Sequence, residues 1–279
     1  MTQGTVVDGE EVLGALSPSR AGDFRTCPLL FRLRTIDRLP EGPSADAVRG
    51  TLVHKVLELL FDLPALDRTP EQAQALVHRA WEDVLESDPR AAELFTGEGP
   101  DILAWLVRCR ESLAAYFGLE DPRRLEPAER EVYVETLLES RLLLRGFVDR
   151  IDVSRDGDVR VVDYKSGRSP RVGFESTALF QMRFYALVWW RSRGVVPRLL
   201  QLIYLGDGQV LRYEPDEEDL LATERMIEAV WAAIRLARET GEYLPRRSWA
   251  CSWCSFKEFC PEFGGTPPAL PPPREPAVS

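Results

Sequence analysis

Several features are scarce or missing in this sequence, and each shortage excludes a class of protein. The longest purely apolar stretches are only a few residues, such as 186–190, whereas a membrane-spanning helix needs roughly 20. The first residues, MTQGTVVDGEEVLG, lack the basic and apolar regions of a signal peptide. No phosphate-binding loop of the form G-x-x-x-x-G-K-S/T occurs. We therefore expect a cytoplasmic protein without a membrane span or a P-loop nucleotide site.

Lysine and histidine are also rare. The chain has 32 arginines, only three lysines and two histidines, and its net charge is -10. An acidic chain argues against a uniform phosphate-binding surface, but the local placement of charge matters more than the total. Five arginines lie between residues 20 and 38, against two aspartates. This patch is compatible with phosphate binding and equally with a solvated helix face.

The order of the predicted elements indicates an α/β core with a helical insertion. Ser17 followed by Pro18 predicts a helix that runs to about Cys27, and apolar spacing predicts further helices over about 47–61 and within 70–119. Later segments alternate between strand and helix patterns: strands at 131–138, 141–153, 158–165, 199–205 and 209–214, and helices at about 175–193 and 216–240.

We expect one domain over the 279 residues. Residues 1–15 are predicted to be poorly ordered, although VVDG at 6–9 could form an edge strand. The expected parts are N-terminal helices over 17–61, a helical insertion over 62–126, an α/β core over 127–245, a cysteine segment over 246–263 and a disordered tail over 264–279.

Two charged residues stand two positions apart in the motif VVDYKSG. Asp163 and Lys165 leave the same face of the predicted strand. Charges on one face of a valine-rich strand are costly to bury unless something ligates them. A cation bound by the carboxylate, with the ammonium directed at a phosphate or a water, would remove that cost. A plain surface strand with a neighbouring ion pair is the alternative.

The preceding strand places Asp149 just before an Asp-Gly turn. If three residues, 155–157, close this hairpin with the glycine left-handed, then Ser154 pairs with Asp158. Asp149 then lies directly opposite Asp163, with the side chains about 5 Å apart. Like charges at that spacing repel unless a cation lies between them. We predict this register, because a two-residue turn would put the carboxylates on opposite faces.

One of the two histidines lies in a setting that suits a positioned imidazole. His54 is on a predicted helix, among apolar neighbours, with Gly50 one turn before it. Taken alone, such a histidine is more often an ordinary core or surface residue. His78 is interpreted in that ordinary way.

Four short motifs follow one another along the chain. They are G-x-x-x-H at Gly50 and His54, G-x-x-D at Gly146 and Asp149, D-x-K at Asp163 and Lys165, and Q-x-x-x-Y at Gln181 and Tyr185. In this order they resemble the PD-(D/E)XK nuclease superfamily, specifically its RecB-type exonuclease branch, across residues 17–263. The resemblance implies a restriction-endonuclease-like fold, in which helices flank a mixed central sheet.

The resemblance also implies metal-dependent cleavage of DNA. His54, Asp149 and Asp163 would bind Mg²⁺ or Mn²⁺, with the main-chain carbonyl of Tyr164 as a further ligand. The metal would polarise the scissile phosphate and acidify the attacking water. Lys165 would orient that water or stabilise charge in the transition state.

Three further residues receive supporting roles from the same resemblance. Gln181 and Tyr185 lie one helical turn apart on one face, where they would hold the DNA strand near the metal. Glu131 would be an auxiliary acid. Each also has an ordinary interpretation as a polar or aromatic residue of its element.

Five cysteines in a cytoplasmic protein are better interpreted as metal ligands or core residues than as disulfides. Cys251, Cys254 and Cys260 form a tight group, Cys27 stands far upstream, and Cys109 fits a helical core. Four thiolates can hold zinc or an iron–sulfur cluster. The spacing resembles that of AddB-type and CRISPR-associated nucleases, which favours a structural [4Fe–4S] cluster over zinc or unligated thiols.

The leading hypothesis is a DNA exonuclease that acts on single strands or ends in repair or recombination, alone or with a helicase or repair partner. The alternative is a non-catalytic DNA-binding or scaffold subunit with a structural metal centre. The presence of all four candidate catalytic residues favours the nuclease.

Overall fold

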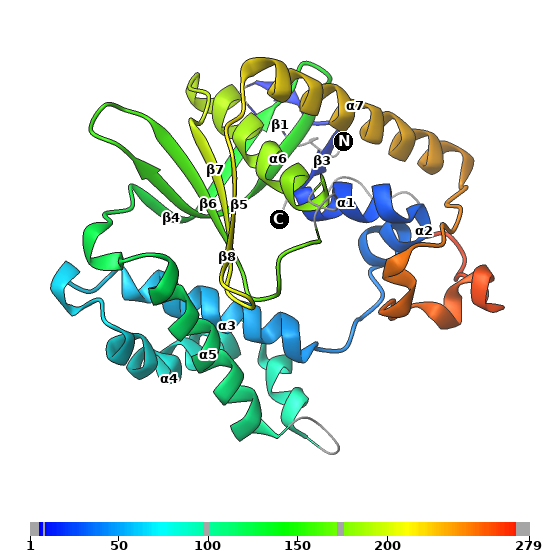
Figure 1. Ribbon diagram of the computed structural model, residues 1–279. Coiled ribbons are helices and arrows are strands. Elements are labelled where there is room, and N and C mark those ends of the chain that lie inside the picture. The colour runs from blue at the N-terminus through cyan, green and yellow to red at the C-terminus, as the bar shows by residue number, and fades with distance from the viewer. Residues whose placement is uncertain (1–5, 8, 97–100, 172–175, 272–279) are drawn as a thin grey trace.

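Six strands form a mixed sheet at the centre of the computed structural model, which describes residues 6–7, 9–96, 101–171 and 176–271 (Figure 1). The strands are β3 (Gly14–Leu16), β4 (Glu129–Leu137), β5 (Leu142–Val153), β6 (Val159–Lys165), β7 (Leu199–Tyr204) and β8 (Gln209–Tyr213). A separate antiparallel pair joins β1 (Val6–Val7) to β2 (Glu10–Glu11).

The sheet order is β3-β5-β6-β7-β8, with β4 paired along the other side of β5. β3 is parallel to β5 and β7 is parallel to β6, whereas the other neighbours are antiparallel. On one side, β5 pairs with β3 over 142–144 and with β6 over 150–153. Within the described chain, residues 145–149 of β5 therefore have a strand partner only in β4. The candidate site lies at the end of this stretch, where one side of β5 has no neighbouring strand.

Helices cover both faces of the sheet (Figure 1). One face packs against α1 (Pro18–Thr26), α6 (Ser176–Arg193) and α7 (Glu217–Thr240), which share a core with Val161 and Leu200. The other face packs against α3 (Ala45–Leu60), α4 (Pro70–Ser87) and α5 (Ile102–Leu119), which share a core with Val162 and Ile203. Neighbouring strand residues serve opposite faces, as the pleat requires.

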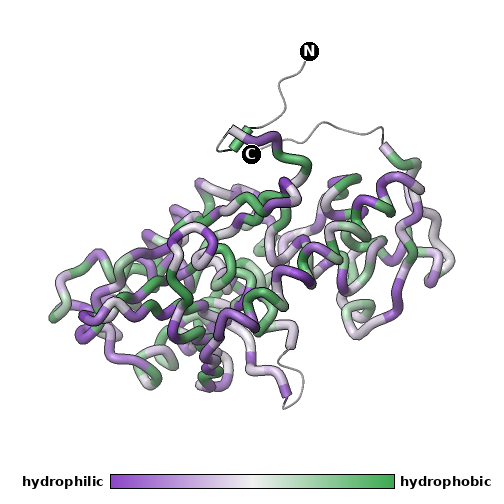
Figure 2. Tube along the Cα trace, turned by 90° about the horizontal axis from the view of Figure 1, so that it is seen from above, coloured by the Kyte–Doolittle hydropathy of each residue, from purple (hydrophilic) through white to green (hydrophobic). Residues whose placement is uncertain are grey.

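Short helical turns connect these elements. α2 (Pro28–Phe31) continues into a π-helical turn, Arg32–Ile36, and single 3₁₀ segments occupy Ala65–Asp67, Pro89–Phe95 and Pro122–Arg124. The cysteine segment consists of 3₁₀ turns at Trp249–Ser252, Lys257–Phe259 and Pro261–Phe263. Within the described residues no helix combines the length and apolar character needed to cross a membrane, and Figure 2 shows apolar and polar positions interspersed along the chain.

Helix ends follow the signals in the sequence. The Ser17 hydroxyl accepts the Arg20 N–H at 3.3 Å, and Pro18 begins α1, as predicted. Gly194 and Gly241, with φ of 72° and 76°, end α6 and α7. The predicted helical stretch 70–119 contains α4 and α5.

The predicted register of the β5–β6 hairpin is confirmed. Ser154 donates its N–H to Asp158 at 2.9 Å, and the glycine of the turn, Gly157, has a φ of 88°. The ladder runs from Val153 opposite Val159 to Arg150 opposite Val162. The next position of the same register is Asp149 opposite Asp163.

The prediction that residues 1–15 are poorly ordered is wrong for the segment next to α1. Val12 is 3% exposed, Leu13 donates its N–H to Arg141 at 2.9 Å, and β3 begins at Gly14. A strand of three residues is too short for an alternating pattern to reveal. Residues 1–5 and 8 lie outside the described chain.

The prediction of a disordered tail over 264–279 is wrong for the first part of that segment. Residues 264–271 are described, and the Arg32 guanidinium donates to the Pro268 carbonyl. Residues 272–279 lie outside the described chain.

A buried arginine fastens the end of α5 to the sheet. Arg150 is 1% exposed and donates to the two carboxylate oxygens of Glu120 at 2.8 and 3.0 Å. It also contacts Asp152 at 3.2 Å and donates to the Tyr164 hydroxyl. Burial lowers the pKa of Arg150, but Tyr164, Glu120 and Asp152 outweigh it and raise the pKa well above its usual value, so the guanidinium stays charged.

We expect Arg150→Met to lower the free energy of unfolding by about 3–5 kcal/mol, because Glu120 would remain buried without its cation. Urea denaturation of the two proteins measures this loss. The double variant Arg150→Met/Glu120→Gln should recover a large part of it. A single variant as stable as the wild type would show that this pair does not fasten α5.

Candidate active site

The Asp149 carboxylate lies where the β5–β6 ladder ends. Its Oδ2 accepts the main-chain N–H of Tyr164 at 2.7 Å. A side-chain oxygen thus replaces the next backbone partner, and the two strands separate at this point. Burial raises the pKa of Asp149, but the combined effect of His54 and the Tyr164 N–H is larger and lowers it. The pKa of Asp149 therefore lies below its usual value.

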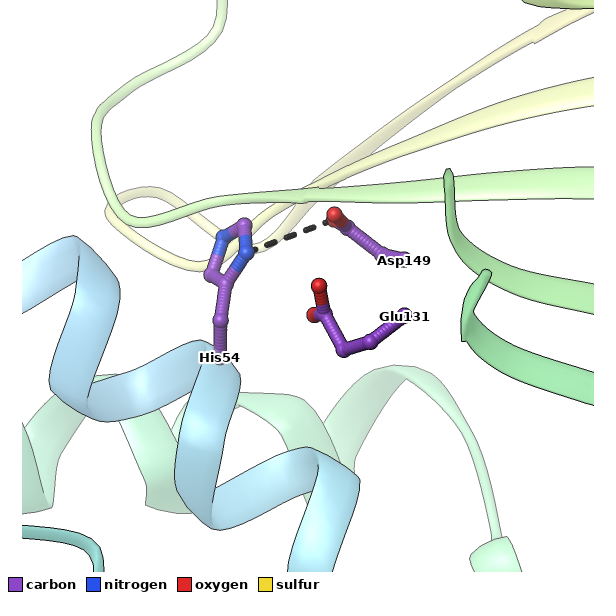
Figure 3. A group of neighbouring side chains, drawn as sticks. All are labelled: His54, Glu131 and Asp149. Carbon is purple, nitrogen blue, oxygen red and sulfur yellow. Dashed lines mark ion pairs between the residues drawn. The ribbon is translucent and has the colours of Figure 1, made fainter. Parts of the chain in front are cut away.

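His54 reaches this gap from α3. Its Nδ1 is 3.4 Å from Asp149 Oδ2 (Figure 3). Gly50, one turn earlier, permits the close approach, because a Cβ there would lie 3.1 Å from the Ser166 hydroxyl after β6. Burial lowers the pKa of His54, but the Asp149 carboxylate outweighs it and gives a pKa of about 9. Without a cation, this imidazole therefore forms an ion pair with Asp149.

A third ligand-type residue, Glu131, completes the group. His54, Glu131 and Asp149 each offer an atom within 4.8 Å of the others (Figure 3). Burial, followed by the charge of Asp149, raises the pKa of Glu131 to about 7. Sequence reasoning gave Glu131 only an auxiliary role, whereas the structure places it within this group.

The backbone at Glu131 is strained. Its φ is 43°, inside a strand, and the β4–β5 pairs on both sides put it opposite Asp149. A left-handed conformation costs a residue with a side chain about 1–2 kcal/mol. Strain of this kind often marks a functional site.

We expect Glu131→Gly to stabilise the metal-free protein by about 1 kcal/mol, because glycine accepts this φ and removes a carboxylate beside Asp149. The same variant should cleave DNA more slowly than the wild type. Thermal unfolding in EDTA, together with a cleavage assay, measures both effects. A variant less stable than the wild type would contradict the strain.

Asp163 and Lys165 form a second set of contacts beside the first. Lys165 Nζ is 2.7 Å from Asp163 Oδ2 and donates to Gln181 Oε1 at 2.9 Å. The Gln181 amide donates to Asp163 Oδ1 at 2.9 Å. Burial and the nearby Asp149 raise the pKa of Asp163 to about 6. The predicted same-face placement of Asp163 and Lys165 is confirmed.

Tyr185 lies beneath this set. Its ring packs where Gly146 has no Cβ, since an added Cβ would lie 2.7 Å from Tyr185 Cε1. The Gln181 amide lies 3.5 Å from its hydroxyl. Only 7% of Tyr185 is exposed, which leaves little of the ring for contact with a DNA strand. The geometry favours a residue that positions Gln181.

The donor set fits a hard divalent cation. Burial and the charge of Asp149 raise the pKa of both Glu131 and Asp163, so the group carries more negative charge than its protein partners balance. The Lys165 carbonyl faces β7, where it accepts from Leu205 at 2.8 Å. Since successive strand residues alternate direction, the Tyr164 carbonyl points to the Asp149 side. Carboxylate, carbonyl and imidazole ligands suit Mg²⁺ and Mn²⁺.

The four predicted cluster cysteines line one cavity of about 290 Å³ between α2 and the C-terminal segment. Main-chain N–H groups of Arg246 and Ser248 lie 3.3 and 3.4 Å from the sulfurs of Cys27 and Cys251. The pKa of Cys260 is raised by burial and by its three neighbours, Cys27, Cys254 and Cys251. Cys109 is separate and buried in the helical core.

The four thiols are not gathered at the spacing of zinc ligands. A zinc ion with Zn–S bonds of about 2.3 Å holds its sulfurs about 3.8 Å apart. All four cysteines are among the described residues, yet no three of their sulfurs lie within 4.8 Å of one another.

Comparisons with known proteins agree with this geometry. The model of the PD-(D/E)XK nuclease superfamily matches residues 15–261. Gene 69 protein of Mycobacterium phage D29 is 27% identical over 208 residues, which covers 64% of this chain and 70% of the phage protein. A crystal structure of a "Putative exonuclease" from Eubacterium rectale has a TM-score of 0.55 and 14% identity, with 86% of each chain covered.

The structural likeness supports a restriction-endonuclease-like fold. The family match begins in β3, ends within the cysteine segment and includes every residue of the site described above. This chain therefore belongs to the PD-(D/E)XK nuclease superfamily.

Proposed function

We propose that this protein is a divalent-metal-dependent deoxyribonuclease of the RecB-type branch. It would act as an exonuclease on single strands or ends, in cytoplasmic DNA repair or recombination, with a helicase or another repair protein as a partner. The observation that supports this proposal is the convergence of His54, Glu131 and Asp149, within 4.8 Å of one another, beside Asp163 and Lys165.

His54, Glu131, Asp149 and the Tyr164 carbonyl would hold the cation, and Asp163, whose carboxylate Lys165 and Gln181 position, would join them. A bound Mg²⁺ or Mn²⁺ supplies Lewis-acid polarisation of the phosphodiester and lowers the pKa of a water. The family requires such a metal in general, and the present donors are those that a hard cation prefers.

Lys165 would place a positive charge beside the proposed cation. Asp163 and Gln181 fix its ammonium from two sides, at 2.7 and 2.9 Å. With 30% of its side chain exposed, it can still donate to an incoming phosphate oxygen. A fixed cation next to the phosphate stabilises the charge that develops during hydrolysis.

Access to these groups comes through a cleft of about 450 Å³. It is lined by His54, Lys165 and Gly50, together with Ser166 and Arg168 of the loop that follows β6. The cleft lies between α3 and the sheet, so α3 forms one wall. Such a wall would favour a narrow substrate such as a single strand over a duplex.

The cysteine cavity would hold a structural [4Fe–4S] cluster. Its support is the set of four thiols around one cavity, since four cysteine ligands suit such a cluster. The cluster would join α2 to the C-terminal segment across a loop of more than two hundred residues. Its expected role is stability.

A cleavage assay on end-labelled single-stranded and double-stranded DNA tests the proposed activity. We expect cleavage with Mg²⁺ or Mn²⁺, none in EDTA, and severe loss in Asp163→Ala and Lys165→Ala. Unchanged cleavage in both variants would contradict the proposed site. A folded, cluster-containing protein that binds DNA without cutting it would favour the scaffold alternative.

A further inference from the structure

A row of side chains leads away from the cation site along β5. Arg145, Phe147 and Asp149 stand at every second position, about 7 Å apart along the strand. On β4, Tyr133 lies opposite Phe147 and Glu135 lies opposite Arg145. The part of β5 that carries this row is the stretch with a strand partner only in β4.

Two aromatic rings on this row are open to solvent. Phe147 is 58% exposed and Tyr133 is 45% exposed, and their ring centroids lie 5.3 Å apart. The intervening residues of β5, such as Leu144 and Val148, are buried in the core beneath α6. The rings therefore lie on the opposite face, one step from the residues that would hold the cation.

Positive charge accompanies the rings. Arg145 stands two positions before Phe147 on β5, and its charge and that of Arg38 add to burial in lowering the pKa of Arg20. Within the described residues none of the three forms an ion pair with an acidic side chain. The Tyr133 hydroxyl donates to the Glu135 carboxylate at 2.6 Å, so that carboxylate already has a hydrogen-bond partner other than an arginine. Guanidiniums without carboxylate partners are available to phosphates.

The geometry assigns Tyr133 and Phe147 as a base-stacking platform for single-stranded DNA, with Arg145 and its arginine neighbours along the phosphate backbone. This inference rests on the proposed nuclease function and deepens it by naming the strand's path. Every base has a π-face, so stacking on aromatic rings tolerates any sequence. In a duplex those faces already stack on one another, and the platform therefore selects unpaired strands.

An exposed cross-strand aromatic pair also stabilises a hairpin by itself, so the test must separate stacking from folding. Tyr133→Leu/Phe147→Leu keeps apolar bulk and removes both π-faces. Phe147→Tyr keeps both rings and the Tyr133 hydroxyl and serves as the matched control. Binding of a fluorescein-labelled oligothymidylate and of a labelled blunt duplex is measured by anisotropy in EDTA, where no cleavage is expected.

We expect the leucine pair to bind the oligothymidylate about tenfold more weakly, which is about 1.4 kcal/mol. Duplex binding should change less than about twofold, and the aromatic control should match the wild type on both probes. Equal losses on both probes, or no loss on either, would overturn the platform. The two proposals can fail separately. If the wild type cleaves DNA but the leucine pair binds the oligothymidylate normally, only the platform is refuted. If the wild type does not cleave DNA, the proposed nuclease function is refuted, whatever the leucine pair binds.

Discussion

Asp149→Ala is expected to lower the rate of DNA cleavage by a factor of about a thousand or more. The Asp149 carboxylate touches His54 at 3.4 Å and holds the Tyr164 N–H at 2.7 Å, so its loss removes a ligand and frees the end of β6. Removal of one fixed electrostatic group from an active site typically costs a factor of about 10²–10³. Loss of the cation adds its own contribution.

Initial rates on labelled single-stranded DNA, at saturating Mg²⁺ or Mn²⁺, measure this effect. The same hairpin supplies a matched control, because Asp156 lies exposed in its turn and Asp156→Ala should cleave like the wild type. The two histidines offer a second comparison. His54→Ala should lose activity about a hundredfold or more, whereas His78, with a side chain 84% exposed, should be dispensable. Equal rates for Asp149→Ala and Asp156→Ala would remove Asp149 from the site.

Cys251→Ser is expected to abolish the visible absorbance of the purified protein and to lower its melting temperature by about 10 °C or more. A cluster held by Cys27 and Cys251 closes a loop of more than two hundred residues. In the chain-entropy model such a closure contributes about 5 kcal/mol. For a protein of this size, each kcal/mol shifts the melting temperature by about 2–4 °C.

Anaerobic purification, metal analysis and thermal unfolding test this prediction together. Cys109→Ala is the control, because Cys109 is buried in the helical core and lines no part of the cysteine cavity. That variant should keep its iron and colour. A colourless wild-type protein that contains zinc alone would contradict the cluster.

The residues of one turn were enough to predict how Asp149 and Asp163 lie relative to each other. The Asp-Gly pair at 156 and 157 indicated a three-residue turn, and that turn fixed Asp149 opposite Asp163. The residue spacing of the four motifs placed the remaining side chains on the correct elements. These signals are short in range, and so they can be read without knowing the fold.

Glu131 was harder to recognise, although the same reasoning applies to it. Leu138 donates its N–H to Leu142 across a three-residue turn, and this register puts Glu131 opposite Asp149. The left-handed residue of that turn is Arg141, with a φ of 63°, instead of a glycine. Without the glycine the turn type had no signal in the sequence.

Long-range contacts account for most of what the sequence did not reveal. β3 pairs with a stretch of β5 more than a hundred residues away, and three residues carry no periodic signal. The burial of Arg150 against Glu120 also depends on two distant elements meeting. Neither contact follows from local propensity.

The central claim is that one divalent cation binds where β4, β5 and α3 meet. A crystal of the protein soaked in Mn²⁺, with anomalous data collected at the manganese edge, tests it most directly. We predict one strong peak within bonding distance of His54, Glu131 and Asp149. Manganese bound only elsewhere, with these three side chains unchanged, would contradict the claim.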